Sequence, residues 1–109
     1  MKKSVQYILT FFIGISALIS VALLWEKNLI LSITLIILSA LMLLLKKSKR
    51  EIETFIVCAI AGGVAESFAI VFGVWQYGNP NLFNIPFWLI PLWGIAAIFI
   101  VRVYLHFRK

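Results

Sequence analysis

The chain has 109 residues, of which 63% are hydrophobic and only 13% are charged, and its formal net charge is +6. A typical soluble domain is about 45–50% apolar and about 25% charged, and so small a protein cannot hide such an excess in its own core. The composition therefore excludes an ordinary soluble domain and predicts one transmembrane domain over residues 1–109. The basic residues lie in short clusters between apolar runs, which indicates membrane topology and argues against nucleic acid as a partner.

Four apolar stretches are long enough to cross the lipid bilayer as helices, which takes roughly 20 residues each. In chain order they cover residues 5–25, 29–45, 52–75 and 85–105. None of them alternates with a period of two, so we predict an all-α integral membrane protein whose four transmembrane helices form a bundle. The first stretch is too long for the apolar core of a cleaved signal peptide, and we expect it to stay as an anchor.

The basic residues predict how the chain is threaded. Lys27 stands alone at one side of the membrane, whereas nine of the ten basic residues fall on the other side. Because positive charge gathers in cytoplasmic segments, we expect a multi-pass protein of the cell (inner) membrane with both termini in the cytoplasm. Four of these residues also form a cluster that should attract anionic lipid headgroups. The cluster consists of Lys46, Lys47, Lys49 and Arg50.

Glu66 is a single carboxylate in the apolar stretch "GGVAESFAIVFGVW". The helical rise of about 1.5 Å per residue places it near the middle of the membrane, roughly 15 Å from Arg102. We expect Arg102 to snorkel to the cytoplasmic interface and Glu66 to be protonated. Three glycines share its face and should pack closely against a neighbouring helix. They are Gly62, Gly63 and Gly73. Glu66 is a candidate catalytic or ligand-binding acid, and the alternative is a polar tie between helices.

An aromatic and proline-rich stretch follows, "GVWQYGNPNLFNIPFWLIPLWG" at residues 73–94. Pro91 falls inside the fourth apolar stretch, where it should kink the helix and free the carbonyl of Phe87. Trp93 lies deeper than an interfacial tryptophan and should pack over the region of Gly73. Five residues are candidates to line a ligand cavity with Glu66, and the alternative is an interfacial belt beside a tight turn. They are Trp75, Tyr77, Asn79, Trp88 and Trp93.

The spacing from Glu66 to Trp93 resembles a pattern in membrane proteins of carotenoid biosynthesis, namely the hydratase-like family and the small lycopene cyclase subunits. About a quarter of the chain takes part in this resemblance. Its residues are Glu66, Gly73, Trp75, Tyr77, Pro86, Pro91 and Trp93. The resemblance implies an isoprenoid-facing pocket in which Glu66 is the acid. In outline the chain is also similar to small multidrug resistance transporters, whose membrane glutamate lies in the first helix, where this chain has none.

Three functional hypotheses follow. The first is a small membrane protein, with a homo-oligomer as one option, that binds a lipid-soluble ligand or a partner membrane protein around Glu66 and the aromatic 75–93 hairpin. The second is an isoprenoid-modifying enzyme or enzyme subunit, and the third is a proton-coupled transporter. The sequence has no cysteine–histidine cluster, no paired carboxylates and no glycine-rich phosphate loop. We therefore expect no metal and no cofactor, and the sequence leans away from an enzyme without deciding the point.

Overall fold

The computed structural model describes residues 2–73 and 85–108, and over these residues the protein is all-α, as predicted. Its helices are α1 (Lys3–Leu24), α2 (Asn28–Leu44), α3 (Lys49–Val71) and α4 (Leu89–Phe107). Among them α1, α3 and α4 are long and apolar enough to cross a membrane, whereas α2 is equally apolar but has only 17 residues. The described residues therefore make a helical protein whose composition and helix lengths suit a membrane.

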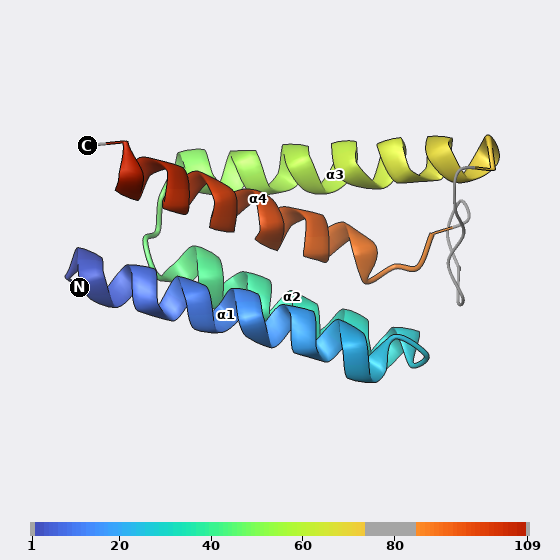
Figure 1. Ribbon diagram of the computed structural model, residues 1–109, viewed down its shortest axis with the longest axis horizontal. Coiled ribbons are helices and arrows are strands. Elements are labelled where there is room, and N and C mark those ends of the chain that lie inside the picture. The colour runs from blue at the N-terminus through green and yellow to red at the C-terminus, as the bar shows by residue number, and fades with distance from the viewer. Residues whose placement is uncertain (1, 74–84, 109) are drawn as a thin grey trace.

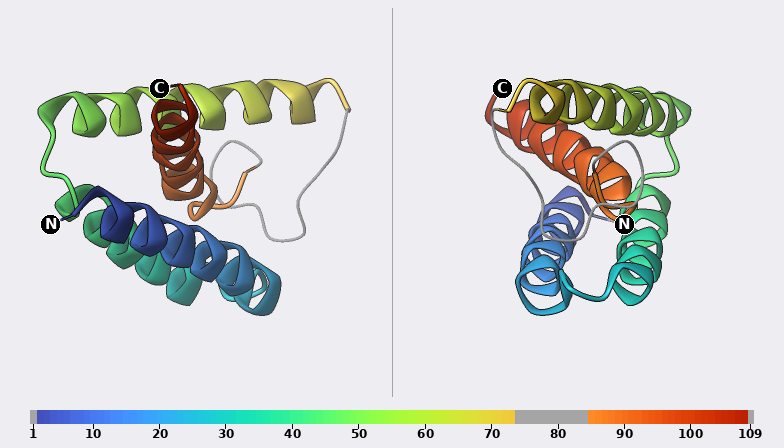
Figure 2. Two further views of the ribbon diagram at one scale, coloured as in Figure 1. Left: turned by 60° about the vertical axis from the view of Figure 1, so that its left-hand side comes forward. Right: turned by 90° about the vertical axis from the view of Figure 1, so that its right-hand side faces the viewer.

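The fourth helix, α4, lies at the centre of the fold. It packs against α1, α2 and α3, whereas α3 makes extensive contacts with α4 alone. α1 and α2 form an antiparallel hairpin on the side of α4 that faces away from α3 (Figure 1 and Figure 2). α1 begins and α4 ends at the same end of the long axis, which measures 43 Å. The helices thus form three layers, the α1–α2 hairpin, α4 and α3.

The start of α3 differs from the predicted range of 52–75, because the helix begins at Lys49. The hydroxyl oxygen of Ser48 caps the helix by accepting a hydrogen bond from the Glu51 backbone N–H at 3.4 Å. Ser-x-x-Glu is the spacing of a capping box, in which the serine satisfies an N–H group that the first turn leaves without a partner. The first turn of α3 is therefore helical although its residues are polar and lie outside the predicted apolar range.

The end of α3 also differs from that range, because the helix ends at Val71. Gly73 has a φ of +79°, and its N–H donates to the Ile70 carbonyl at 2.9 Å. This left-handed glycine and its backward hydrogen bond are typical of a helix C-terminus. The prediction that Gly73 lies within the helix and on its packing face is corrected accordingly. Apart from Gly73 itself and its chain neighbours, no atom of the described residues lies within 4 Å of the place where a Cβ of Gly73 would sit.

α4 begins later than the predicted range of 85–105, at Leu89, and this changes the role of Pro91. Pro91 is the third residue of the helix, where a backbone N–H has no acceptor within the helix. A proline there removes no helical hydrogen bond. The Phe87 carbonyl, to which Pro91 has no N–H to donate, accepts a hydrogen bond from the Ile90 N–H at 3.3 Å instead.

The buried core lies between the hairpin and α4. α2 buries one face of residues three or four apart, and α4 and α1 bury the faces opposite it. These residues include Leu31, Leu35 and Met42 of α2, Ile95 and Ile98 of α4, and Ile13 and Ala17 of α1. The outward faces are also apolar, with large side chains such as Leu18, Leu23 and Phe68 exposed. Water-soluble monomers rarely expose such extensive apolar surface, whereas lipid accommodates it.

Candidate functional site

A buried charged cluster joins all four helices near the end where α1 begins and α4 ends. Arg102 of α4 forms a bidentate ion pair with Glu51 of α3, with Nε donating to Oε2 at 3.0 Å and Nη2 to Oε1 at 2.7 Å. Nη1 donates to Thr10 Oγ1 of α1 at 2.9 Å and to Met42 Sδ of α2 at 3.4 Å. Nη2 also donates to the Met42 carbonyl at 2.7 Å. The five N–H donors of the guanidinium therefore all have acceptors.

The cluster is shielded from its surroundings and extends through neutral groups. The side chains of Arg102 and Glu51 are only 4% and 7% exposed. The Thr10 hydroxyl that accepts from Arg102 donates in turn to the Gln6 carbonyl at 2.7 Å. The Gln6 side-chain amide then donates to the Leu45 carbonyl at 3.1 Å, which joins the start of α1 to the end of α2. With all its donors occupied, Arg102 holds the helices together and offers none to a ligand.

The prediction that Arg102 snorkels to the interface is wrong, because its head is buried against Glu51. A signal for this pair was present in the sequence. Glu51 lies just before the third apolar stretch and Arg102 lies near the end of the fourth, so antiparallel helices bring the two to a similar depth. Comparing the depth of Arg102 with that of every acidic residue, and not only with Glu66, would have found the pair.

Glu66 lies half-buried on α3, on the next turn after the two adjacent glycines. It is fifteen residues beyond Glu51, or roughly 22 Å along the helix. Arg102 is bound to Glu51 and is therefore not the cation that serves Glu66. Three of the candidate ligand-binding residues lie outside the described part of the chain, so the structure does not test their cavity. They are Trp75, Tyr77 and Asn79.

The other two candidate aromatic residues make packing contacts. The buried indole N–H of Trp88 donates to Asn28 Oδ1 at 3.2 Å, which connects the start of α4 to the start of α2. Trp93, 37% exposed, lies over Gly62 rather than over Gly73, where we expected it. These contacts do not test the predicted cavity around Glu66, which stays a prediction.

Gly62 and Gly63 both lie buried in the contact between α3 and α4, as the small-residue face suggested, but their surroundings differ. A Cβ on Gly62 would lie 2.3 Å from Cγ and Cδ2 of the Trp93 ring. A Cβ on Gly63 would meet Ile90 at 3.4 Å, an ordinary contact distance. Of these two positions, only position 62 requires a glycine, because the Trp93 ring lies so close to it.

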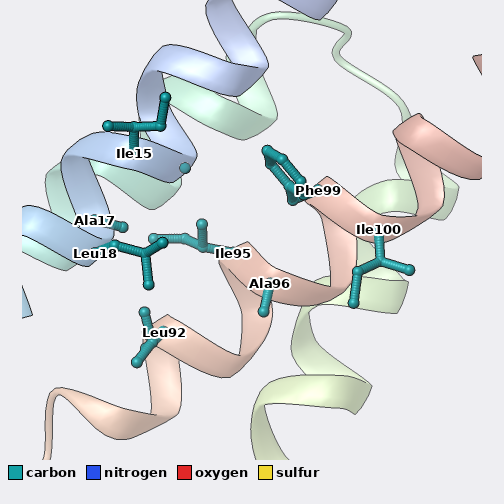
Figure 3. A pocket seen from close by; sticks show the side chains of 9 residues that line it. Ile15, Ala17, Leu18, Leu92, Ile95, Ala96, Phe99 and Ile100 are labelled. Atoms are coloured by element: carbon teal, nitrogen blue, oxygen red, sulfur yellow. The ribbon is translucent and has the colours of Figure 1, made fainter.

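An apolar groove of about 240 Å³ opens between α1 and α4, on the side of α4 away from α3 (Figure 3). Its wall on α1 consists of Gly14, Ile15, Ala17 and Leu18. Its wall on α4 consists of Leu92, Ile95, Ala96, Phe99 and Ile100. The space exists because small residues face each other across the contact, and at one point the Phe99 ring lies directly over Gly14. The sequence carried an unused signal for this groove, because Gly14 and Ala17 are small residues at helical spacing.

The described residues contain no group of three histidine, cysteine, aspartate or glutamate side chains that could hold a metal ion. Two of the features described so far are a saturated charged cluster and an open apolar groove. The groove is the candidate functional site, because it is the one of the two with room for another molecule.

A comparison with known families identifies the family to which the chain belongs. A family model described as "Protein of unknown function (DUF2878)" matches residues 8–107, and the chain belongs to this family. No curated protein and no solved structure matches the chain significantly. The resemblance to carotenoid-biosynthesis proteins therefore stays a prediction.

Proposed function

We propose that this member of the DUF2878 family crosses the membrane four times with both termini in the cytoplasm, and that it binds a lipid-soluble molecule with a hydrocarbon chain. The observation that carries the binding proposal is the groove between α1 and α4, whose lining side chains are all apolar. A hydrocarbon chain is the complement of such a surface, because it leaves no polar group without a partner. The bound molecule would enter from the surrounding lipid, since the groove is open at the protein surface.

The threading proposal is supported by the distribution of charge over the observed fold. Lys3 and Arg108 lie at the end where α1 begins and α4 ends, and the turn between α2 and α3 lies there too. That turn and the start of α3 carry Lys46, Lys47, Lys49 and Arg50. Positive charge gathers on the cytoplasmic side. α2 is about 25 Å long, so the bilayer would thin slightly around it.

The proposal moves the binding site away from the predicted position around Glu66. α3, which carries Glu66, packs on the other side of α4, so the two places are separate. The enzyme and transporter hypotheses both depend on Glu66 and stay predictions. The infrared carboxyl band of Glu66 tests their premise of a protonated acid. A carboxylate signal at neutral pH that disappears in Glu66→Gln would contradict it.

Photocrosslinking tests the groove. A phosphatidylcholine with a diazirine in one acyl chain is added below stoichiometry to the purified protein in detergent, and labelled peptides are mapped by mass spectrometry. We expect the label to concentrate on the α1 and α4 residues that line the groove. Ala96→Leu adds a large side chain to the groove wall and should reduce this labelling several-fold.

Ala61→Leu is the matched control, because it adds the same side chain at an exposed position of α3. It should leave the labelling of α1 and α4 unchanged. Label spread evenly over the exposed apolar residues of all helices, with no effect of Ala96→Leu, would contradict the binding proposal.

Single cysteines in a Cys58→Ser background test the threading. Lys47→Cys should react with an impermeant maleimide only after the membrane is permeabilised, because the α2–α3 turn is proposed to be cytoplasmic. Lys27→Cys, in the α1–α2 turn, should react in intact cells. The reverse pattern would overturn the orientation.

A further inference from the structure

A second hollow lies on the α1–α4 side of the molecule, at the end where α1 begins. It has a volume of about 300 Å³. Its lining residues are Lys3, Gln6 and Tyr7 of α1, Lys46 after α2, and Leu105 and Arg108 at the end of α4. Unlike the groove, it is lined partly by polar groups, and three of these six side chains are cations.

The positive charge of this hollow is not neutralised within residues 2–73 and 85–108. Among the described residues no acidic side chain pairs with Lys3, Lys46 or Arg108. Glu51, the acid in the adjacent polar network, is held by Arg102 instead. The hollow is therefore suited to an anion.

The hollow and the groove follow the same helix pair and are separated by a short aromatic stretch. The Tyr7 ring lies 4.3 Å from the His106 ring, and Phe11 meets Phe99 edge-on at 5.1 Å. On α4 the interval from Ile100 of the groove to Leu105 of the hollow is roughly 8 Å, and on α1 the interval from Tyr7 to Gly14 is roughly 10 Å. A molecule with a charged head and an acyl chain can span both.

We propose that the molecule bound between α1 and α4 is an anionic glycerophospholipid of the cytoplasmic leaflet. Its phosphate lies between Lys3, Lys46 and Arg108, and one acyl chain follows the aromatic stretch into the groove. The charges favour an anionic over a zwitterionic head, because the hollow offers three cations and no carboxylate. This proposal rests on the proposed function and adds the chemical class of the ligand.

Native mass spectrometry of the full-length, delipidated protein tests the headgroup. Dioleoyl-phosphatidylglycerol and dioleoyl-phosphatidylcholine are offered separately at equal concentration, so that only the head differs. We expect clearly stronger retention of phosphatidylglycerol. Lys3→Gln and Arg108→Gln should each lower it about fivefold, the effect of one cation near a lipid surface, and leave phosphatidylcholine unchanged.

Lys27→Gln removes the same charge far from the hollow, in the α1–α2 turn, and should have no effect. An equal loss in this control would mean attraction by net charge and would overturn the assigned site. Displacement of phosphatidylglycerol by inorganic phosphate at the same concentration would show an anion site without a role for the chain, and would also overturn the proposal.

The two proposals fail in different ways. Equal retention of both lipids, lowered for both by Ala96→Leu, would overturn the headgroup assignment and leave hydrocarbon binding in the groove intact. Retention of neither lipid, together with no preferred labelling of the groove, would overturn the proposed function itself.

Discussion

The two sides of α4 use small residues in opposite ways. Towards α3 the packing is reciprocal, because Trp93 of α4 lies over Gly62 of α3 while Phe55 of α3 lies over Gly94 of α4. Each glycine accommodates a ring, and the helices meet closely. Towards α1 only Phe99 over Gly14 repeats this pattern, and Ala96 has space beside it. A small residue produces close packing only where the facing helix supplies a large side chain, and elsewhere it leaves room for a ligand.

Phe55 is a large residue that packs closely because a small residue faces it. Phe55 lies seven residues before Gly62 and eleven before Glu66, so it shares their face of α3. In the structure its ring lies against Gly94, and a Cβ there would come within 2.4 Å of Cε2. Phe55 therefore belongs to the contact between α3 and α4.

The largest effect is expected from breaking the charged cluster, which holds both sides of α4 at one end. Glu51→Ala leaves the Arg102 guanidinium buried without its carboxylate, and should lower the free energy of unfolding by about 3–5 kcal/mol. Unfolding by dodecyl sulfate in mixed micelles, followed by circular dichroism, measures the loss. The double variant Glu51→Leu with Arg102→Met removes both charges and should recover most of it. A single variant as stable as the wild type would contradict the role of the pair.

The second-largest loss of stability is expected for Gly62→Ala, and it distinguishes Gly62 from its neighbour Gly63 on the closely packed side of α4. Gly62→Ala forces the Trp93 ring to move and should cost about 1–3 kcal/mol. Gly63→Ala meets only ordinary contacts and gains helix propensity, so it should be neutral or more stable by up to about 1 kcal/mol. The same micellar titration compares them. Equal shifts for both would mean that the Trp93 contact does not define this packing.

The smallest effect is expected on the open side. Ala96→Leu fills space in the groove and should change the free energy of unfolding by no more than about 1 kcal/mol, in the stabilising direction. Ala61→Leu, exposed on α3, supplies the baseline for adding a leucine. If Ala96→Leu destabilised the protein as strongly as Gly62→Ala, the α1–α4 contact would be closely packed and no groove would exist to bind a chain.

By itself the sequence determined the helical class, the four helices and the short length of α2, because these depend on the length and hydropathy of each segment. The capping box at Ser48 and Glu51 was also readable, and would have placed the start of α3 correctly. The turn position of Gly73 was less readable, since glycine serves both helix packing and helix ends. The predicted cavity around Glu66 includes residues outside the described part of the chain and stays a prediction.

Only the tertiary structure decided which partner each special residue meets. Glu51 and Arg102 are 51 positions apart, and their pairing depends on how α3 and α4 are rotated and how far each extends. The same holds for Gly62 and Gly63, which differ by one position and yet only one lies beneath a ring. Hydropathy is a property of each residue in its solvent, whereas a contact is a property of two helices at a given angle and depth. Contacts of this kind put α4 at the centre of the fold. They also produced the groove on one side of α4 and the close packing on the other.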